Sequence, residues 1–327
     1  MIQTNGIFTI SLDFELYWGV RDKRKLSVYS ENLLNIRRIV QELLDVFDEY
    51  NVHTTWGIVG FLFFSNFGKL KQNIPDKLPN YTNTNLSPYS YINGLDKVED
   101  RYHFAPDLIH LICQYDNQEI GTHTFSHYYC LEDGQSIDEF RADICSAINI
   151  ANKKGIKIKS LIFPRNQLNK DYLKVLRELG IKCYRGNEKS WMFSTINEKG
   201  IRHMLRRALR LIDAYLNISG YNCYTLDEIW RSSEILFSIP SSRFLRPVSK
   251  KLVFFERLRI GRIKNAMTYA AKNKKIFHLW WHPHNFGVNT RQNMLFLRGV
   301  LDHFKELRYK YGMYSLNMGE LIEIIDH

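Results

Sequence analysis

The order of apolar and polar positions predicts strands that alternate with helices along most of the chain. Short apolar runs typical of buried strands cover residues 7–12, 52–59, 119–122, 158–163, 181–184 and 275–281. Apolar residues recur at helical spacing over 31–50, 106–115, 137–154, 169–179, 292–311 and 316–325. Strands separated by helices of this length favour βα units and a parallel sheet. The pattern therefore predicts an α/β fold.

Two stretches depart from this alternation. Residues 66–104 are rich in Asn, Tyr, Ser and Pro, and we interpret them as a polar insertion. Residues 201–275 hold 16 Lys or Arg and 5 Asp or Glu residues, an excess equal to the net charge of +11 of the whole chain. We interpret them as a basic insertion. A single domain over residues 1–327 is expected, because α/β barrels commonly run to about 200–250 residues as one unit.

Composition excludes several classes of protein. The chain has 327 residues, of which 45 % are hydrophobic, so disorder is not its main state. Its 5 cysteines include no CxxC pair, which argues against a disulfide framework and a thiolate zinc site. No apolar run reaches the roughly 18 residues of a membrane span. The N-terminus does not resemble a secretory signal, and we therefore expect a cytoplasmic protein.

The basic stretch contains a predicted amphipathic helix over residues 201–216. Its apolar stripe comprises Ile201, Met204, Leu205, Ala208, Ile212 and Tyr215. The interpretation we favour is an outer barrel helix with this stripe against the strands. The alternative is a helix on an anionic membrane, which would place the protein at the inner face. The excess charge also suits a solvated surface, a lipid- or nucleotide-linked saccharide or an acidic glycan, whereas no nucleic-acid-binding motif accompanies it.

Polar residues follow four of the predicted strands. They are Asp13 and Glu15, His123 and His127, Arg165 and Asn166, and His282 and His284. In a barrel, the carboxyl ends of the strands meet on the face that carries chemistry. Residues two apart on a strand face one side, so Asp13 and Glu15 would repel each other unless a positive charge lay between them. Each pair taken alone fits ordinary solvated or hydrogen-bonded residues equally well.

Taken together, four blocks resemble the successive motifs of the polysaccharide deacetylases, the NodB-homology group of carbohydrate esterases. They are SLDFE (11–15), HTFSH (123–127), FPRN (163–166) and WHPH (281–284). Two details depart from the family pattern, because Phe14 separates the two acids and Pro164 precedes Arg165. The resemblance implies a distorted (β/α) barrel with about seven strands, plus the two insertions.

The resemblance also implies a metal held by Glu15, His123 and His127. Two imidazoles and a carboxylate suit Zn²⁺ and leave open positions, although Co²⁺, Ni²⁺, Fe²⁺ and Mn²⁺ take the same ligands. Carried over by position, Asp13 would be the general base and Arg165 its ion-pair partner. The motifs leave open which of Asp13 and Glu15 binds the metal.

The remaining roles concern proton donation and substrate. The resemblance makes His282 the general acid, with His284 as its competitor. We expect Trp18, Asn166, Trp281 and His284 to contact substrate. The predicted activity is metal-dependent removal of an N-acetyl group from an amino sugar of a glycan or glycan precursor, in surface-polysaccharide synthesis or modification. Two alternatives remain: an amidase acting on a small C–N substrate, and an inactive barrel that binds glycan or anionic lipid.

Overall fold

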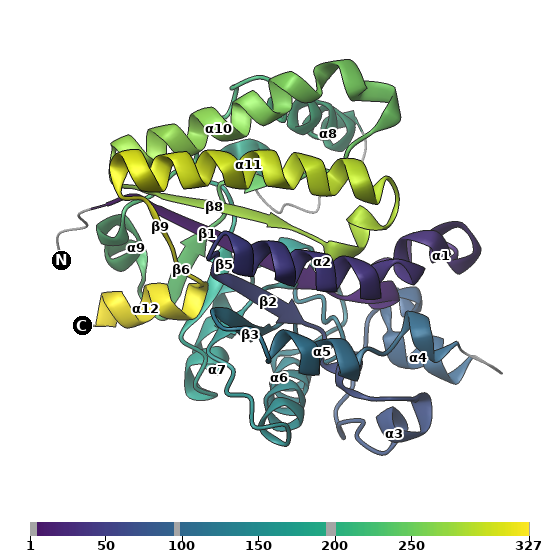
Figure 1. Ribbon diagram of the computed structural model, residues 1–327. Coiled ribbons are helices and arrows are strands. Elements are labelled where there is room, and N and C mark those ends of the chain that lie inside the picture. Colours follow the sequence, from purple (N-terminus) through teal and green to yellow (C-terminus); the bar gives the residue numbers. More distant parts are fainter. Residues whose placement is uncertain (1–4, 95–98, 194–200, 327) are drawn as a thin grey trace.

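The computed structural model describes residues 5–94, 99–193 and 201–326. All the paired strands of the sheet are parallel, in the order β6-β5-β4-β3-β2-β1-β8-β7, and β9 pairs with β1 outside this path. The strands are β1 (Ile7–Phe14), β2 (Thr54–Ile58), β3 (Gln118–Thr122), β4 (Ser160–Leu161), β5 (Cys183–Gly186), β6 (Phe237–Pro240), β7 (Arg243–Phe244), β8 (Ile276–Trp281) and β9 (Tyr314–Ser315). The sheet curls into the expected α/β barrel (Figure 1).

One extended segment joins the two ends of the sheet. β6 pairs with β5 in register Cys183–Phe237, and β7 pairs with β8 in register Phe244–Trp280. The residues between them continue the ladder, because the Ser241 amide bonds to β5 and the Ser242 amide bonds to β8. β6 and β7 are thus one crossing segment. When they are counted as one strand and β9 is left out, seven strands of the described residues form the wall of the barrel. The predicted distorted barrel is confirmed.

Helices cover the outside of the barrel, and their buried faces follow the apolar periodicity. They are α1 (Leu26–Leu34), α2 (Ile36–Glu49), α3 (Phe67–Lys71), α4 (Pro88–Asn93), α5 (Pro106–Ile112), α6 (Ile137–Asn152), α7 (Leu173–Glu178), α8 (Ile201–Asp213), α9 (Leu226–Ser232), α10 (Glu256–Lys272), α11 (Thr290–Tyr311) and α12 (Met318–Asp326). The helix expected over 31–50 is two helices divided at Asn35, whose side-chain amide donates to the Gly287 carbonyl.

The two stretches interpreted as insertions differ in structure. Within 66–104, Tyr89 of α4 and Tyr102 of a short 3-10 turn (Asp100–Tyr102) are buried against the main core. The basic stretch 201–275 supplies α8, α9 and α10 and also β6 and β7, so part of it is integral to the barrel. No helix of the described residues is long and apolar enough to cross a membrane.

α8 contradicts the favoured interpretation of the amphipathic pattern. Met204, Leu205 and Ile212 of its apolar stripe are exposed, whereas the polar residues Arg206 and Asp213 are buried. Asp213 is held inward by ion pairs with Arg243 and Arg262. Because these buried ion pairs fix the polar side of the helix against the protein, the apolar stripe faces outward.

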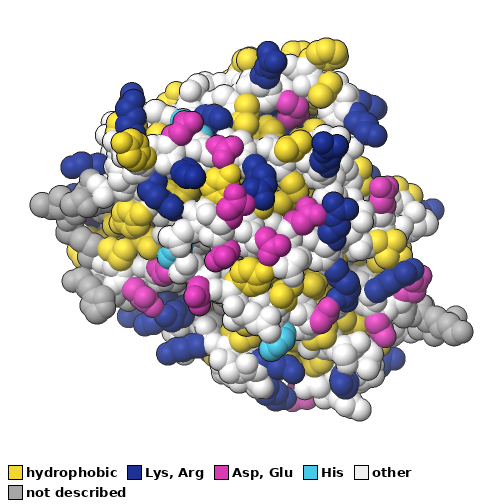
Figure 2. All heavy atoms as spheres, in the orientation of Figure 1, with side chains coloured by type: hydrophobic (Ala, Val, Ile, Leu, Met, Phe, Trp, Pro, Cys, Tyr) yellow, Lys and Arg dark blue, Asp and Glu magenta, His cyan; other side chains and the backbone are white. Residues whose placement is uncertain are grey.

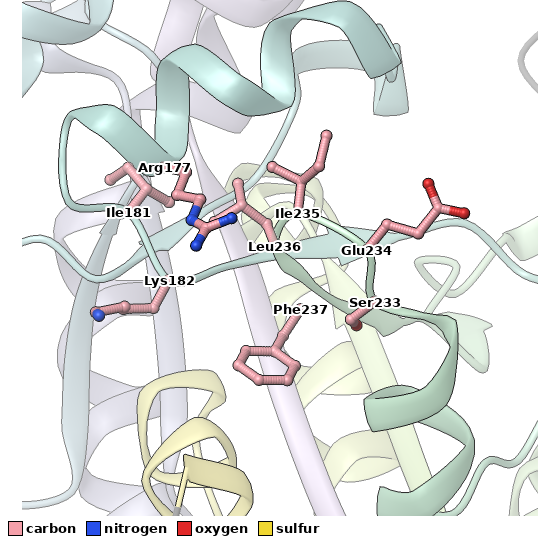
Figure 3. Close-up of a pocket in the computed structure, with 8 residues that line it drawn as sticks. All are labelled: Arg177, Ile181, Lys182, Ser233, Glu234, Ile235, Leu236 and Phe237. Carbon is pink, nitrogen blue, oxygen red and sulfur yellow. The ribbon is translucent and has the colours of Figure 1, made fainter.

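A hollow of about 270 Å³ lies at the amino ends of β5 and β6 (Figure 3). Ile181, Lys182 and Phe237 line it, together with Arg177 of α7. This end of the barrel is opposite to the carboxyl ends of the strands, where the chemistry-bearing side chains gather.

Candidate metal centre and active site

Glu15, His123 and His127 converge on one point at the carboxyl ends of β1 and β3. The Nε2 atoms of His123 and His127 lie 3.3 Å and 2.9 Å from the same Glu15 oxygen, Oε2. The three side chains are buried, and their ligand atoms all lie within 4.8 Å of one another. Glu15 follows β1 directly, and His123 follows β3. The topology therefore brings together residues that are more than a hundred positions apart.

The hydrogen bonds of the two histidines indicate a cation site between their Nε2 atoms and Glu15. Nδ1 of His123 lies 2.8 Å from the carbonyl oxygen of Ile162, which can only accept, so Nδ1 carries the proton in the neutral ring. Nε2 then presents a lone pair to a carboxylate oxygen. Two acceptors at this separation need a proton or a metal ion between them. Nδ1 of His127 is occupied in a similar way, 3.1 Å from the Tyr129 hydroxyl.

Protonation in the site suits metal binding. Burial lowers the pKa of His127 to about 4 against the hydrogen bond and charge of Glu15, so this ring is neutral at pH 7. Burial by itself would raise the pKa of Glu15, but the charge of His282 and the hydrogen bonds with His123 and His127 hold it well below its usual range. A neutral imidazole and an ionised carboxylate are the forms that bind metal.

The loop that carries the two histidines is a tight, braced loop and not a helical turn. Thr124 and His127 have φ angles of 65° and 61°, and a β-branched residue such as Thr124 rarely adopts this conformation. Asp143 of α6 stabilises the loop by accepting hydrogen bonds from the amides of Phe125 and Ser126 at 2.7 Å and 3.1 Å. The ligand geometry therefore depends on a carboxylate outside the four sequence motifs.

Gly19 leaves room for the carboxylate of Glu15. An ideal Cβ at this position would lie 2.0 Å from Oε1 of Glu15, far inside van der Waals contact. The glycine ends a short 3-10 turn over Leu16–Gly19 that follows the acidic pair. Any side chain here would displace the Glu15 carboxylate from the two imidazoles.

Asp13 lies beside this cluster and is paired with Arg185, not with Arg165 as expected. Nη1 and Nη2 of Arg185 donate to Oδ1 and Oδ2 of Asp13 at 2.5 Å and 2.9 Å. Burial would raise the pKa of Asp13, but the charge of Arg185 lowers it below its usual value. Arg185 was missed in the sequence, although it lies just beyond the strand expected over 181–184 and carries the same strand-end signal as the other four groups.

Arg165 lies in a different ion pair. It donates to Asp22, lies 3.7 Å from Glu132, and its guanidinium carbon stacks 4.0 Å from the centre of the Tyr129 ring. Arg165 and Asn166 have φ angles of 56° and 54°. These two successive left-handed residues form a sharp turn after β4, in which Arg165 is held by the loops that follow β1 and β3.

The two histidines after β8 face the acids. Nε2 of His282 lies 3.7 Å from Oδ2 of Asp13 and 3.6 Å from Oε1 of Glu15. Nε2 of His284 lies 3.9 Å from Oε1 of Glu15, and burial lowers the pKa of His284 to about 4. His282 is partly exposed, whereas His284 is buried. His282 is therefore the more accessible of the two.

Two residues expected to contact substrate lie in the core. The Trp18 ring is fully buried, packs against Phe61 and donates from Nε1 to the His103 carbonyl at 2.7 Å. Trp281 is also fully buried, because alternation along β8 turns it outward onto Phe286 and Phe47. These two expectations were wrong, because both rings belong to the core.

Asn166 accepts from Nη2 of Arg185 at 2.8 Å, so in the structure it contacts Arg185.

Trp280, on the inner face of β8, is the aromatic residue beside the site. The guanidinium carbon of Arg185 lies 4.1 Å from the centre of its ring. Phe244 of β7 lies 4.6 Å from Trp280 and 5.9 Å from His282, centroid to centroid. Both rings are only partly buried. The apolar run of β8 contains both Trp280 and Trp281, and only the strand geometry shows that Trp280 and not Trp281 faces the site.

Solved structures that share this fold carry the names of different enzymes. One is a Mycobacterium smegmatis protein described as a candidate polysaccharide deacetylase, 14 % identical over 100 % of this chain and 92 % of that chain, with a TM-score of 0.57. A PuuE allantoinase is 10 % identical over 98 % and 89 %, with a TM-score of 0.54. A GH57-type branching enzyme from Pyrococcus horikoshii is 11 % identical over 98 % and 70 %, with a TM-score of 0.54. At these identities the likeness shows the fold alone.

Sequence comparison is more specific. No curated protein matches the chain. The family model of the polysaccharide deacetylases matches residues 35–184, which include His123 and His127 and end one residue before Arg185. Over residues 35–184, the chain is thus similar to the polysaccharide deacetylases.

Proposed function

We propose that the protein is a metal-dependent carbohydrate de-N-acetylase that removes the acetyl group from an N-acetylated amino sugar of a glycan or glycan precursor. The family match supports a carbohydrate deacetylase. One observation supports metal-dependent de-N-acetylation in particular. Glu15, His123 and His127 converge beside Asp13, an acid that Arg185 keeps ionised. We place the substrate in surface-polysaccharide synthesis or modification, with the saccharide free or linked to a lipid or nucleotide.

The donor set fits a divalent cation, most simply Zn²⁺. Glu15, His123 and His127 would hold it, and Ile162 and Tyr129 orient the two imidazoles from behind. When bound, such a cation lowers the pKa of water to about 7 and polarises an acyl carbonyl. Co²⁺, Ni²⁺, Fe²⁺ and Mn²⁺ accept the same ligands.

Asp13 acts as the general base. Its carboxylate is ionised because Arg185 pairs with both oxygens, and it faces His282 beside the Glu15 cluster. It takes the proton of the attacking water. General-base catalysis of this kind contributes about 10²–10⁴-fold to the rate.

His282 acts as the general acid. It faces both carboxylates and is partly exposed, so an amine that leaves from the sugar can approach it. Buried His284, with its lowered pKa, is neutral at pH 7 and is the poorer proton donor. Trp280 and Phe244 form the wall against which the sugar ring packs.

The test separates metal binding from chemistry. The purified protein, loaded with zinc, should release acetate from N-acetylated oligosaccharides. Asp13→Asn should lower the rate by about 10²-fold or more at unchanged metal content, whereas Glu15→Gln should weaken metal binding about tenfold or more. Elemental analysis and an acetate assay measure both effects. Full metal content with no acetate release from any such substrate would contradict the activity, and turnover of a small cyclic amide instead would favour the amidase alternative.

A further inference from the structure

Exposed apolar side chains concentrate on one part of the surface. Of the described large hydrophobic residues that are exposed, most lie between residues 204 and 269. The exposed fraction reaches 70 % for Met204, 56 % for Leu205 and 90 % for Phe254. Monomeric soluble proteins rarely expose a contiguous apolar patch of this kind unless it is an interaction site.

Two elements form this patch. α8 exposes Met204, Leu205, Leu211 and Ile212, followed by Leu216. The short 3-10 helix η8 (Lys250–Phe255) has no buried residue and exposes Val253, Phe254 and Phe255. The Tyr215 and Phe255 rings lie 6.2 Å apart, centroid to centroid, which joins the two elements. In Figure 1, α8 lies beside the end of α10 that η8 enters. We call these residues the α8–η8 surface.

Positive charge surrounds the apolar residues. Arg207, Arg210 and Arg246 line a groove of about 680 Å³ along α8, with Lys23 on its other side. Lys250, Lys251 and Arg257 are exposed around η8. Among the described residues, no ion pair links any of these seven side chains to a carboxylate. By contrast, Figure 2 shows Lys and Arg interspersed with Asp and Glu on the face over α2 and α11.

We propose that the α8–η8 surface docks on an anionic lipid bilayer. The apolar side chains would enter the interface between headgroups and acyl chains, and the basic side chains would meet the anionic headgroups. The leaflet that carries such lipids is the cytoplasmic one, which places the protein at the inner face of the membrane. This proposal does not depend on the reaction catalysed.

A second copy of the chain fits this surface less well. Two copies joined through α8 would bring arginines and lysines of the same sign together, and such juxtaposition opposes association. A bilayer offers both an apolar layer and negative charge, and so matches both features of the surface. Lys23 of the groove lies in the same connection between β1 and α1 as Glu15, so a docked protein would hold its site near the membrane.

Vesicle sedimentation of the full-length protein tests the proposal. We expect binding to phosphatidylcholine vesicles that contain phosphatidylglycerol, and little binding to phosphatidylcholine alone. Raising the salt from about 0.1 M to about 1 M should weaken the binding, because the screening length falls from about 10 Å to about 3 Å. Equal binding to both kinds of vesicle, or no binding to the anionic ones, would overturn the proposal.

Matched variants locate the surface. Phe254→Ser should weaken vesicle binding about tenfold, whereas Tyr309→Ser on α11, a position that is 96 % exposed, should bind like the wild type. Lys250→Glu/Lys251→Glu should weaken it tenfold or more, whereas Lys69→Glu/Lys71→Glu on α3, with the same change in net charge, should not.

Circular dichroism confirms that each variant is folded, and analytical ultracentrifugation measures the state of association. If Phe254→Ser converts a dimer to a monomer and leaves vesicle binding unchanged, the surface is an interface between copies and the proposal fails. If both lysine double variants lose binding equally, net charge and not this surface is responsible.

Discussion

Arg185 holds Asp13 through both terminal nitrogens, in a buried ion pair that links the carboxyl ends of β5 and β1. Paired bonds of this kind are stronger and more precise than a single charge contact. Arg185 is itself fixed by Asn166, by the Ser11 hydroxyl at 3.2 Å, and by the Trp280 ring beneath it. We therefore regard it as the residue that positions Asp13.

Arg185→Lys tests this role. A lysine keeps the charge but cannot donate two parallel hydrogen bonds, so kcat should fall by about tenfold to a hundredfold. The acid limb of the pH–rate profile should move to higher pH, because Asp13 loses part of what lowers its pKa. Arg165→Lys is the control, since Arg165 pairs with Asp22. The assignment would be wrong if Arg165→Lys slowed the reaction more than Arg185→Lys did.

Substitution of Trp18 should affect the stability of the protein, whereas substitution of Trp280 should affect its activity. Trp18→Ala removes a fully buried ring and should lower the free energy of unfolding by about 3–5 kcal/mol, with KM unchanged in the protein that remains folded. Trp280→Ala should raise KM and lower kcat, because its ring contacts Arg185 and lies beside His282. Urea denaturation and steady-state kinetics measure the two effects. A changed KM in Trp18→Ala would restore the sequence-based expectation that this ring contacts substrate.

Asp143 should make stability depend on pH. Burial raises the pKa of its carboxyl from 3.8 to about 6, although Ser126 and the amides of Phe125 and Ser126 oppose the shift. The folded state therefore binds this proton more tightly than the unfolded chain does. The contribution to the free energy of unfolding is complete below pH 4 and declines by about 3 kcal/mol as the pH rises through 6.

Asp143→Asn removes this titration. The difference in free energy of unfolding between wild type and variant should therefore shrink as the pH rises from 4 to 7, as measured by urea denaturation at each pH. The variant should also be less stable at pH 4, because an amide nitrogen cannot accept the hydrogen bonds that Asp143 accepts. A difference that stays constant across this range would show that Asp143 has an ordinary pKa.

Much of the fold could be predicted from the sequence, because most strands are short apolar runs buried on both faces. β6 and β7 could not, since Phe237–Pro240 and Arg243–Phe244 are short, contain Pro240 and Arg243, and lie in a charged stretch. Their pairing with β5 and β8 is decided by barrel closure. α8 shows the same limit: the pattern predicted an amphipathic helix but not which side would face the protein, because the buried partners of Asp213 lie on β7 and α10.

Part of the candidate site could also be predicted from the sequence, and part could not. Glu15, His123 and His127 were expected together and do converge, because each follows a strand of one parallel sheet. The partner of Asp13 was misassigned, because Arg165 follows β4, Arg185 lies at the end of β5, and only the turn after β4 decides between them. The roles expected of Trp18 and Trp281 failed because nearness along the chain does not determine which way a ring points.

The crossing segment that forms β6 and β7 has a consequence for how the protein can be altered. It covers the backbone groups that β5 and β8 would otherwise present to other chains, and exposed strand edges invite aggregation. Deleting residues 201–275 as a separable insertion would leave β5 and β8 as two unpaired edge strands in the shortened protein. A smaller version of the protein should instead keep residues 237–244 and shorten the chain on either side of them.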